Sequence, residues 1–159
     1  MIFVTVGSQK FQFNRLLKQI DELVETKVIN ESIFAQIGNS DYVPKNFQCK
    51  KYLNRDEFRE IMDQSNIVIT HGGTGAIIGA VKKNKKVIAV PRLKKYGEHI
   101  DDHQIQLLKE FDEMDLIYSC YEVNELGEAI ISIKEKIYKK YNSNTSNIID
   151  SLRKYINGI

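Results

Sequence analysis

The chain has 159 residues, of which 42% are hydrophobic and 28% are charged, and its formal net charge at pH 7 is +2. This length and composition suit one α/β domain with a sizeable core. The nearly balanced charge gives no nucleic-acid footprint, and no apolar run reaches the roughly 18 residues that a membrane span requires. The N-terminus lacks a basic region ahead of an apolar stretch, so we expect a cytoplasmic chain.

Strand-like and helix-like patterns alternate along the sequence. Short apolar runs, typical of buried parallel strands, lie at residues 2–6, 33–37, 47–53, 66–70, 86–90 and 115–119. Amphipathic spacing predicts helices over residues 13–24, from 54 onward, and over 76–83, 101–110, 123–137 and 148–156. Asn54 followed by Glu57 predicts a capping box at the start of the second helix. Cys49 and Cys120 fit no metal-binding spacing and are expected to be reduced thiols.

This alternation predicts the fold class and the domain organisation. We expect a single α/β domain over residues 1–159, built on a Rossmann-like, doubly wound parallel sheet of about six strands. The C-terminal helices are expected to begin at about residue 122, and residues 142–146 are the only linker-like stretch.

Two segments carry the chemistry that the sequence suggests. Residues 71–75, with the sequence His-Gly-Gly-Thr-Gly, lie between a predicted strand and a predicted helix. Such a turn presents main-chain N–H groups and a positive helix end to an anion. Residues 101–104, Asp-Asp-His-Gln, open the helix that follows the next strand. Both segments should meet at the carboxyl edge of the sheet, where α/β proteins bind ligands, and they predict a site for a nucleoside diphosphate.

Several of these residues also have structural interpretations. The glycines could only form a tight strand–helix turn, and His71 could only pack against it. Asp101 and Asp102 could cap a helix as readily as contact a sugar. No cysteine cluster or HExxH sequence suggests a metal, so no metal is expected. Arg92, Lys94 and Lys95 lie in the loop beside the predicted site and could attract an anionic ligand.

These motifs, in this order, resemble a known family over residues 1 to about 130. The resemblance rests on Phe3-Val4-Thr5-Val6-Gly7-Ser8, on His71 to Gly75, and on Val90-Pro91-Arg92, Gly97-Glu98-His99 and Asp101-Asp102-His103-Gln104. They resemble the C-terminal, nucleotide-binding half of MurG-like GT-B glycosyltransferases, the glycosyltransferase family 28 C-terminal domain. The similarity is closer to the small, free-standing (PssE-type) subunit of split bacterial exopolysaccharide and capsule glycosyltransferases. The small cytosolic subunit of the eukaryotic dolichol-linked N-acetylglucosaminyltransferase is a more distant relative.

The resemblance implies a function and its partners. The chain would be the UDP-sugar-binding subunit of a two-subunit inverting glycosyltransferase. Its expected activity is that of a β-1,4-galactosyltransferase acting on a lipid-diphosphate-linked glucose in exopolysaccharide or capsule synthesis. A membrane-anchored partner subunit would supply the acceptor half and the base, and would recruit the chain to the cytoplasmic face of the membrane. No cofactor, metal or nucleic acid is implied, and the exposed site edge makes a homodimer of the isolated chain plausible.

The resemblance also assigns roles to individual residues. The diphosphate would be faced by Gly7 and Ser8, and the turn under the phosphates would be formed by Gly73, Thr74 and Gly75, beside Gly72. The uracil pocket would be lined by main-chain groups of Tyr52 and Leu53. The hydroxyls of the donor sugar would be bonded by His103 and Gln104. His71 could neutralise charge on the departing UDP. MurG-like members carry a ribose-binding glutamate at the position of Gly79, so ribose recognition is expected from Glu98 or from the partner. A side chain at Gly73 is expected to exclude the ligand.

Two other functions remain open at this point. The chain could be a non-catalytic activator that stabilises a partner glycosyltransferase, which the departure at Gly79 favours. It could also be an NAD-binding module, although residues 7–10 lack the GxGxxG sequence and no acidic residue ends the second strand. Calorimetric titration with UDP would separate donor binding from pure activation.

Overall fold

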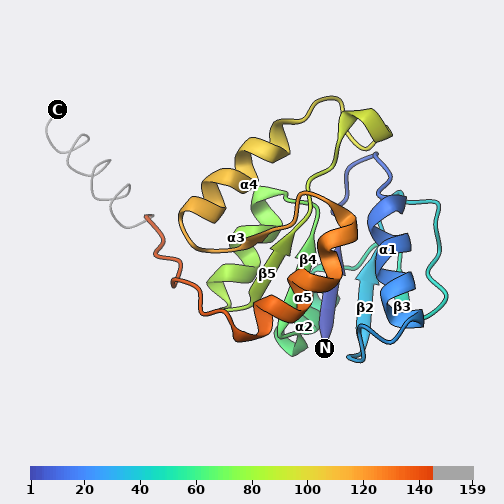
Figure 1. Cartoon of the computed structure of the whole chain (residues 1–159), viewed down its shortest axis with the longest axis horizontal. Coiled ribbons are helices and arrows are strands. Elements are labelled where there is room, and N and C mark those ends of the chain that lie inside the picture. The colour runs from blue at the N-terminus through green and yellow to red at the C-terminus, as the bar shows by residue number, and fades with distance from the viewer. Residues whose placement is uncertain (145–159) are drawn as a thin grey trace, which may run out of the picture.

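The computed structural model describes residues 1–144 and has a six-stranded parallel sheet at its centre (Figure 1). The strands are β1 (Ile2–Thr5), β2 (Ile33–Gln36), β3 (Gln48–Lys50), β4 (Ile67–Thr70), β5 (Lys86–Ala89) and β6 (Tyr118–Ser119). Their order in the sheet is β3-β2-β1-β4-β5-β6, and each neighbouring pair is parallel. This is the doubly wound Rossmann arrangement, in which the chain reverses direction across the sheet between β1 and β4. The predicted fold class is confirmed.

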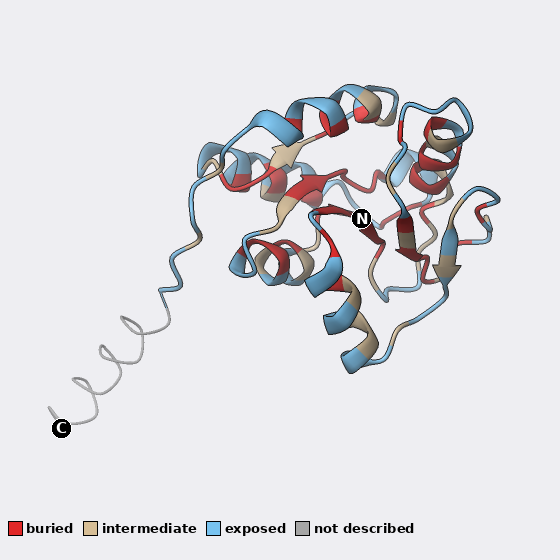
Figure 2. Cartoon of the chain, turned by 90° about the horizontal axis from the view of Figure 1, so that it is seen from below, coloured by how far each residue is buried: buried red, intermediate tan, exposed pale blue. Residues whose placement is uncertain are grey.

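Helices cover both faces of the sheet. The helices are α1 (Asn14–Glu25), α2 (Arg55–Gln64), α3 (Thr74–Lys82), α4 (His103–Glu113) and α5 (Leu126–Glu135). α1 and α5 pack with the side chains of one sheet face, and α2, α3 and α4 pack with those of the other. The outer helix faces are exposed and the central strands are buried (Figure 2).

Alternation along each strand divides the core between these two faces. Ile2 and Val4 point to the α1 and α5 side, whereas Phe3 points to the side of α2, α3 and α4. Since side chains alternate along a strand, a run that is apolar at every position must be covered on both faces. All four residues of β1 and of β4 are buried accordingly.

The starts of three helices show how local chemistry sets their first residues. The predicted capping box of α2 is confirmed, since the Asn54 side chain accepts main-chain N–H bonds and the Glu57 side chain accepts one in return. α3 begins at Thr74, two residues earlier than predicted, because Gly73 already serves as its N-cap. α4 begins two residues later than predicted, at His103, with Asp102 as its N-cap.

Several elements are shorter than the apolar pattern predicts. β3 and β6 contain only three and two residues. Asp115 has a left-handed backbone with φ of 57°, and the N–H of Leu116 closes α4 by donating to the oxygen of Phe111, so the chain turns before β6 begins. A short 3-10 turn, η2 (Val123–Glu125), precedes α5. The helix predicted at 148–156 lies outside the described residues.

Two further expectations concern residues 1–144. Cys49 and Cys120 are free thiols, as predicted. None of the helices in this part of the chain has both the length and the hydropathy needed to cross a membrane.

Candidate functional site

Three adjacent strands deliver the predicted site segments to one edge of the sheet. β1, β4 and β5 are neighbours and run parallel, so the residues after their last positions, Thr5, Thr70 and Ala89, leave the sheet at the same edge. Residues 7–11 follow β1, residues 71–75 follow β4, and residues 91–102 follow β5 and lead to α4. This edge is where doubly wound proteins bind their ligands.

The imidazole of His71 lies between two of the predicted glycines. A Cβ atom at Gly7 would lie 2.7 Å from Cε1 of His71, and a Cβ atom at Gly73 would lie 2.4 Å from Nε2. Gly7 also has a φ of 76°, a left-handed conformation that glycine adopts at little cost. The absence of both side chains therefore lets the β1 and β4 loops approach each other across the histidine ring.

His71 is buried and electrically neutral at pH 7. Desolvation, with a smaller contribution from the nearby charge of Arg92, lowers its pKa from 6.5 to about 4. Nδ1 lies 3.4 Å from the main-chain oxygen of Thr5, which can only accept, so this contact favours a proton on Nδ1. A neutral ring carries no charge with which to compensate an anion. The expected role in neutralising a departing UDP thus requires His71 to gain a proton when the anion binds.

The N-terminus of α3 offers unused main-chain donors. Its N-cap is Gly73, which has no side chain with which to cap the helix. Thr74 and Gly75 are exposed, and a Cβ atom at Gly75 would meet no atom within 4 Å. Because the first N–H groups of a helix have no intrahelical acceptor, they can bond an anion in that open space. Ser8, on the β1 loop, is also exposed.

Gln104 joins α4 to the loop after β5. Its side-chain oxygen accepts the main-chain N–H of Arg92 at 2.8 Å, which fixes the orientation of the amide group. The amide nitrogen makes no hydrogen bond to any other described residue. Gln104 is therefore held in place by its oxygen, and the side chain is buried, with 3% of its surface exposed.

His103 belongs to a polar cluster at the start of α4. One carboxylate oxygen of Asp101 pairs with Nδ1 of His103, lies 3.3 Å from Nδ1 of His99, and accepts the main-chain N–H of His103 at 3.1 Å. Among residues 1–144, these three side chains form the group that could offer several ligands to a metal ion, since their donor atoms lie within 4.8 Å of one another. Asp101 is the shared acceptor that brings the two histidine rings together.

Glu98 is engaged inside the protein and is closed off from solvent. Its carboxylate is fully buried and forms two bonds of 2.9 Å with the guanidinium of Arg15. It also accepts the main-chain N–H of Leu93 at 2.9 Å, and Arg15 donates in addition to the oxygen of Pro91. The structure therefore corrects the expectation of a ribose contact: Glu98 fastens the loop after β5 to α1.

Arg92 also differs from the sequence-based expectation. It is fully buried and is not a surface group that could attract ligands from solvent, unlike its exposed neighbours Lys94 and Lys95. Its Nη2 atom donates to the main-chain oxygens of Val6, at 2.7 Å, and Phe11, at 3.1 Å. Arg92 thus bonds the main chain at both ends of the loop that follows β1.

The positions predicted to line a uracil pocket lie at the far side of the same edge. Tyr52 and Leu53 follow β3, and Tyr52 is exposed. The N–H of Leu53 donates to the side-chain oxygen of Gln36 at 3.1 Å, so that N–H is already used. The Gln36 amide nitrogen lies 3.5 Å from the main-chain oxygen of Gly7. Gln36 therefore links the uracil-side segment to the glycine loop, a connection that sequence reasoning missed.

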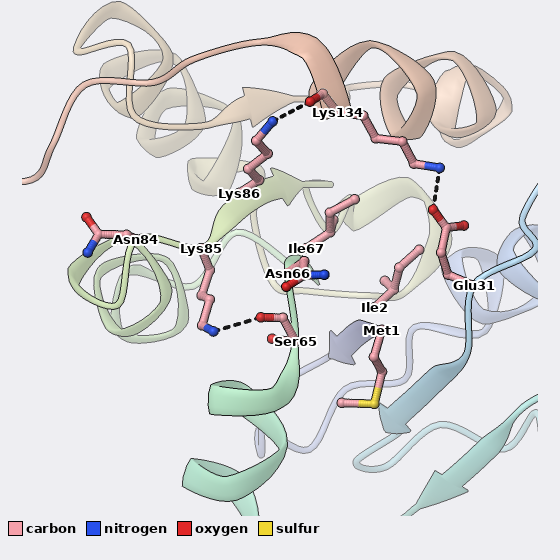
Figure 3. Close-up of a pocket in the computed structure, with 10 residues that line it drawn as sticks. All are labelled: Met1, Ile2, Glu31, Ser65, Asn66, Ile67, Asn84, Lys85, Lys86 and Lys134. Carbon is pink, nitrogen blue, oxygen red and sulfur yellow. Dashed lines mark hydrogen bonds and ion pairs between the residues drawn. The ribbon is translucent and has the colours of Figure 1, made fainter.

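A large cavity of about 470 Å³ lies at the opposite, amino edge of the sheet (Figure 3). Three lysines line it, and each already bonds the protein itself. Lys85 donates to the main-chain oxygen of Ser65, Lys86 to that of Lys134, and Lys134 pairs with Glu31. The charges of this cavity are satisfied internally, so it offers no comparable anion site. A smaller cavity of about 260 Å³ lies on the carboxyl side, beside Pro91, Asp102 and Tyr121.

Known proteins resemble this chain in sequence and in fold. The glycosyltransferase family 28 C-terminal domain profile matches residues 1–157. The UDP-N-acetylglucosamine transferase subunit ALG13 of Mus musculus is 27% identical over 134 residues, which cover 74% of this chain and 10% of that protein. The subunit of the same name from Saccharomyces cerevisiae is 35% identical over 60 residues, 38% of this chain and 28% of that protein. The chain thus spans only a small part of the length of these relatives.

Solved structures show the same fold. A solution structure of ALG13 superposes with a TM-score of 0.62 at 20% identity, covering 91% of both chains. The MurG crystal structure from Acinetobacter baumannii gives a TM-score of 0.57 at 13% identity, over 83% of this chain and 41% of that one. These likenesses place the fold with the C-terminal domains of GT-B glycosyltransferases. Since the family profile covers nearly every residue, the chain belongs to the glycosyltransferase family 28 C-terminal domain family.

Proposed function

We propose that this chain is the donor-binding subunit of a two-subunit inverting glycosyltransferase and that its donor is a UDP-sugar. The observation that carries the proposal is the uncapped N-terminus of α3, which faces open space at Gly75 beside the loops after β1 and β5. Unused N–H donors and a helix dipole suit a diphosphate. The amide nitrogen of Gln104 then serves a hydroxyl of the donor sugar, and main-chain groups of Tyr52 serve the base.

The chemistry follows from these placements. Negative charge grows on UDP as the bond between sugar and phosphate breaks, and fixed N–H donors at that point stabilise the transition state. The acceptor hydroxyl attacks from the opposite face and inverts the anomeric carbon. In this proposal a membrane-anchored partner subunit holds the acceptor and the base, and keeps the chain at the cytoplasmic face. Neither a cofactor nor a metal takes part.

The identity of the sugar and the acceptor belongs to the same proposal. The resemblance to PssE-type subunits favours β-1,4-transfer of galactose to a lipid-diphosphate-linked glucose, as in exopolysaccharide or capsule synthesis. Two of the relatives carry the name of UDP-N-acetylglucosamine transferase subunits. The donor panel in any assay therefore includes UDP-galactose, UDP-glucose and UDP-N-acetylglucosamine.

The first experiment is titration calorimetry of the isolated chain with UDP and with uridine. We expect UDP to bind, uridine to bind more weakly, and the isolated chain to transfer no sugar. A folded chain that gives no heat with millimolar UDP would overturn donor binding. Co-expression with the partner subunit, followed by transfer from radiolabelled UDP-sugars on membranes, then identifies the donor.

A second function, non-catalytic activation of a partner enzyme, is favoured by one specific observation. No carboxylate is exposed for the ribose at the positions considered, because residue 79 is a glycine and Glu98 is buried in its bonds with Arg15 and Leu93. An activator needs its partner surface and no donor site. Under this alternative, Gly75→Val would leave the activity of the reconstituted complex unchanged, whereas donor binding predicts its loss.

A further inference from the structure

Arg92 has an unusual environment for a charged side chain. Its exposed fraction is 0%, and its guanidinium carbon lies 5.5 Å from the centre of the Phe13 ring. Among the described residues, only Nη2 has acceptors, the oxygens of Val6 and Phe11. Nε and Nη1 are buried and have no hydrogen-bond partner among the described residues. A buried donor without an acceptor costs free energy, so each such group in a native protein calls for an explanation.

The surrounding charges leave an uncompensated positive charge. The neighbouring carboxylate is Glu98, which forms its two short bonds with Arg15 and not with Arg92. Two guanidinium groups therefore share one carboxylate, which gives this cluster a net charge of +1. Burial lowers the pKa of Arg92 to about 10, which still leaves the side chain protonated at pH 7.

This charge contacts the loop after β1, one of the loops that form the candidate diphosphate site. Val6 immediately precedes Gly7, and Phe11 is at the other end of the same loop, so Arg92 contacts both ends of the loop. Its main-chain N–H also bonds Gln104 at the start of α4. The positive charge of Arg92 also acts on His71 and contributes to its lowered pKa. Charges inside a protein act over longer distances than exposed ones, because solvent and salt screen them less.

We propose that Arg92 is a positioning residue with an electrostatic task. It holds the β1 loop and α4 in place, and its buried charge adds to the α3 helix end in attracting the negative charges of a nucleoside diphosphate. The inference rests on the proposed function and adds the source of positive charge for a site that uses no metal. Arg92 does not touch the ligand, because its side chain is sealed beneath the loop.

The test separates charge from support by comparing Arg92→Lys with Arg92→Gln. Both replacements keep a hydrogen-bond donor for the loop, but only lysine keeps the charge. We expect Arg92→Gln to weaken UDP binding by about tenfold or more, and uridine binding by less than about threefold. Arg92→Lys should keep UDP affinity within about threefold of the wild-type value. Arg59→Gln, which removes one exposed positive charge from α2, is the control and should change neither.

The outcomes that overturn the inference are distinct. Equal loss of UDP binding in both Arg92 variants would mean that Arg92 is only a support. Equal loss of UDP and uridine binding in Arg92→Gln would mean that its charge does not act on the phosphates. A wild-type chain that fails to bind UDP would overturn the proposed function as well.

A spectroscopic readout tests the charge without any ligand. The groups that act on the His71 pKa are Arg92, His99 and the main-chain oxygen of Thr5, and the Thr70 hydroxyl lies 3.3 Å from Nδ1. We expect the His71 pKa, followed by NMR, to be higher in Arg92→Gln than in the wild-type protein, because a repelling charge is gone. An unchanged value would overturn the inference. If Arg92→Gln does not fold, Arg92→Lys still tests the inference. A folded Arg92→Lys protein whose UDP affinity falls by more than about tenfold would overturn it, because this variant keeps the charge.

Discussion

The ring of His71 occupies the space that a side chain at Gly73 would need, because a Cβ atom there would lie 2.4 Å from Nε2. From the sequence, a side chain at Gly73 is expected to exclude the ligand. The structure shows that such a side chain would also clash with the buried ring of His71, whether or not a ligand is bound. Gly75, two residues further on, has open space in place of such a neighbour.

This difference predicts opposite effects of two alanine substitutions. Gly73→Ala should lower the free energy of unfolding by about 1–3 kcal/mol, because the buried ring cannot easily move. Gly75→Ala should raise it slightly, since alanine favours helix over glycine by up to about 1 kcal/mol. Gly75→Ala should nevertheless weaken UDP binding, because its Cβ enters the space proposed for the diphosphate. Urea denaturation and calorimetry measure the two effects. Gly79→Ala, the same change on the same helix, is the control, and equal UDP affinity in both helix variants would contradict the placement of the phosphates.

The buried histidine predicts how stability depends on pH. The His71 pKa is 6.5 in the unfolded reference and about 4 in the folded protein. Between these values the unfolded chain binds a proton that the folded protein does not, so the free energy of unfolding falls as the pH drops from 6.5 to 4. A pKa difference of this size corresponds to roughly 3 kcal/mol.

The measurement compares urea denaturation of the wild-type protein and of His71→Asn at several pH values. We expect the loss of stability in this window to be smaller in the variant, which has no imidazole to protonate. Parallel curves for the two proteins would show that the His71 pKa is close to its ordinary value. Carboxylates such as Asp21, whose pKa is lowered in the fold, act mainly below this window and affect both proteins alike.

The ion pair of Glu98 with Arg15 predicts a structural role that a ribose contact would not share. Glu98→Gln should lower the free energy of unfolding by about 3–5 kcal/mol, because it leaves a mostly buried guanidinium without its counter-charge. At a temperature where the variant is folded, discrimination between UDP and its 2′-deoxy analogue should be unchanged. Loss of that discrimination in calorimetry would restore Glu98 as the ribose ligand.

Sequence reasoning found the fold because apolar periodicity is a local signal. Six short apolar runs that alternate with amphipathic segments predict a parallel sheet with helices on both faces. The observed strand order then brings residues 71–75 and 101–104 to one edge of that sheet. The surroundings of Arg92 and Glu98 could not be predicted in this way. An arginine in a loop after a proline is normally exposed, and the acceptors of Arg92 lie 86 and 81 residues away along the chain. Burial of a charge depends on such distant partners, which no local pattern contains.

A substitution at Gly79 is expected to strengthen UDP binding. It is exposed on α3, and a Cβ atom there would meet nothing within 4 Å, so a longer side chain fits. Gly79→Glu introduces the carboxylate that MurG-like relatives are expected to use for the ribose. UDP affinity should rise by about tenfold, with stronger discrimination against 2′-deoxy-UDP, because a hydrogen bond to a charged group forms. Gly79→Ala shares the gain in helix propensity but not the carboxylate, so equal affinities of the two variants would refute the alignment of this position.

Gln104 is expected to affect both stability and sugar binding, each through a different atom of its amide group. The oxygen supports the fold, and the nitrogen is proposed to bond the donor sugar. Gln104→Ala removes the acceptor of the Arg92 N–H and leaves that buried group unpaired, which should lower the free energy of unfolding by about 1–3 kcal/mol. The same change removes the amide nitrogen that is proposed to bond the donor sugar. Calorimetry should therefore show a larger loss of affinity for the UDP-sugar than for UDP. Equal losses for both ligands would confine Gln104 to the support of the loop, because the support acts on the diphosphate that both ligands share.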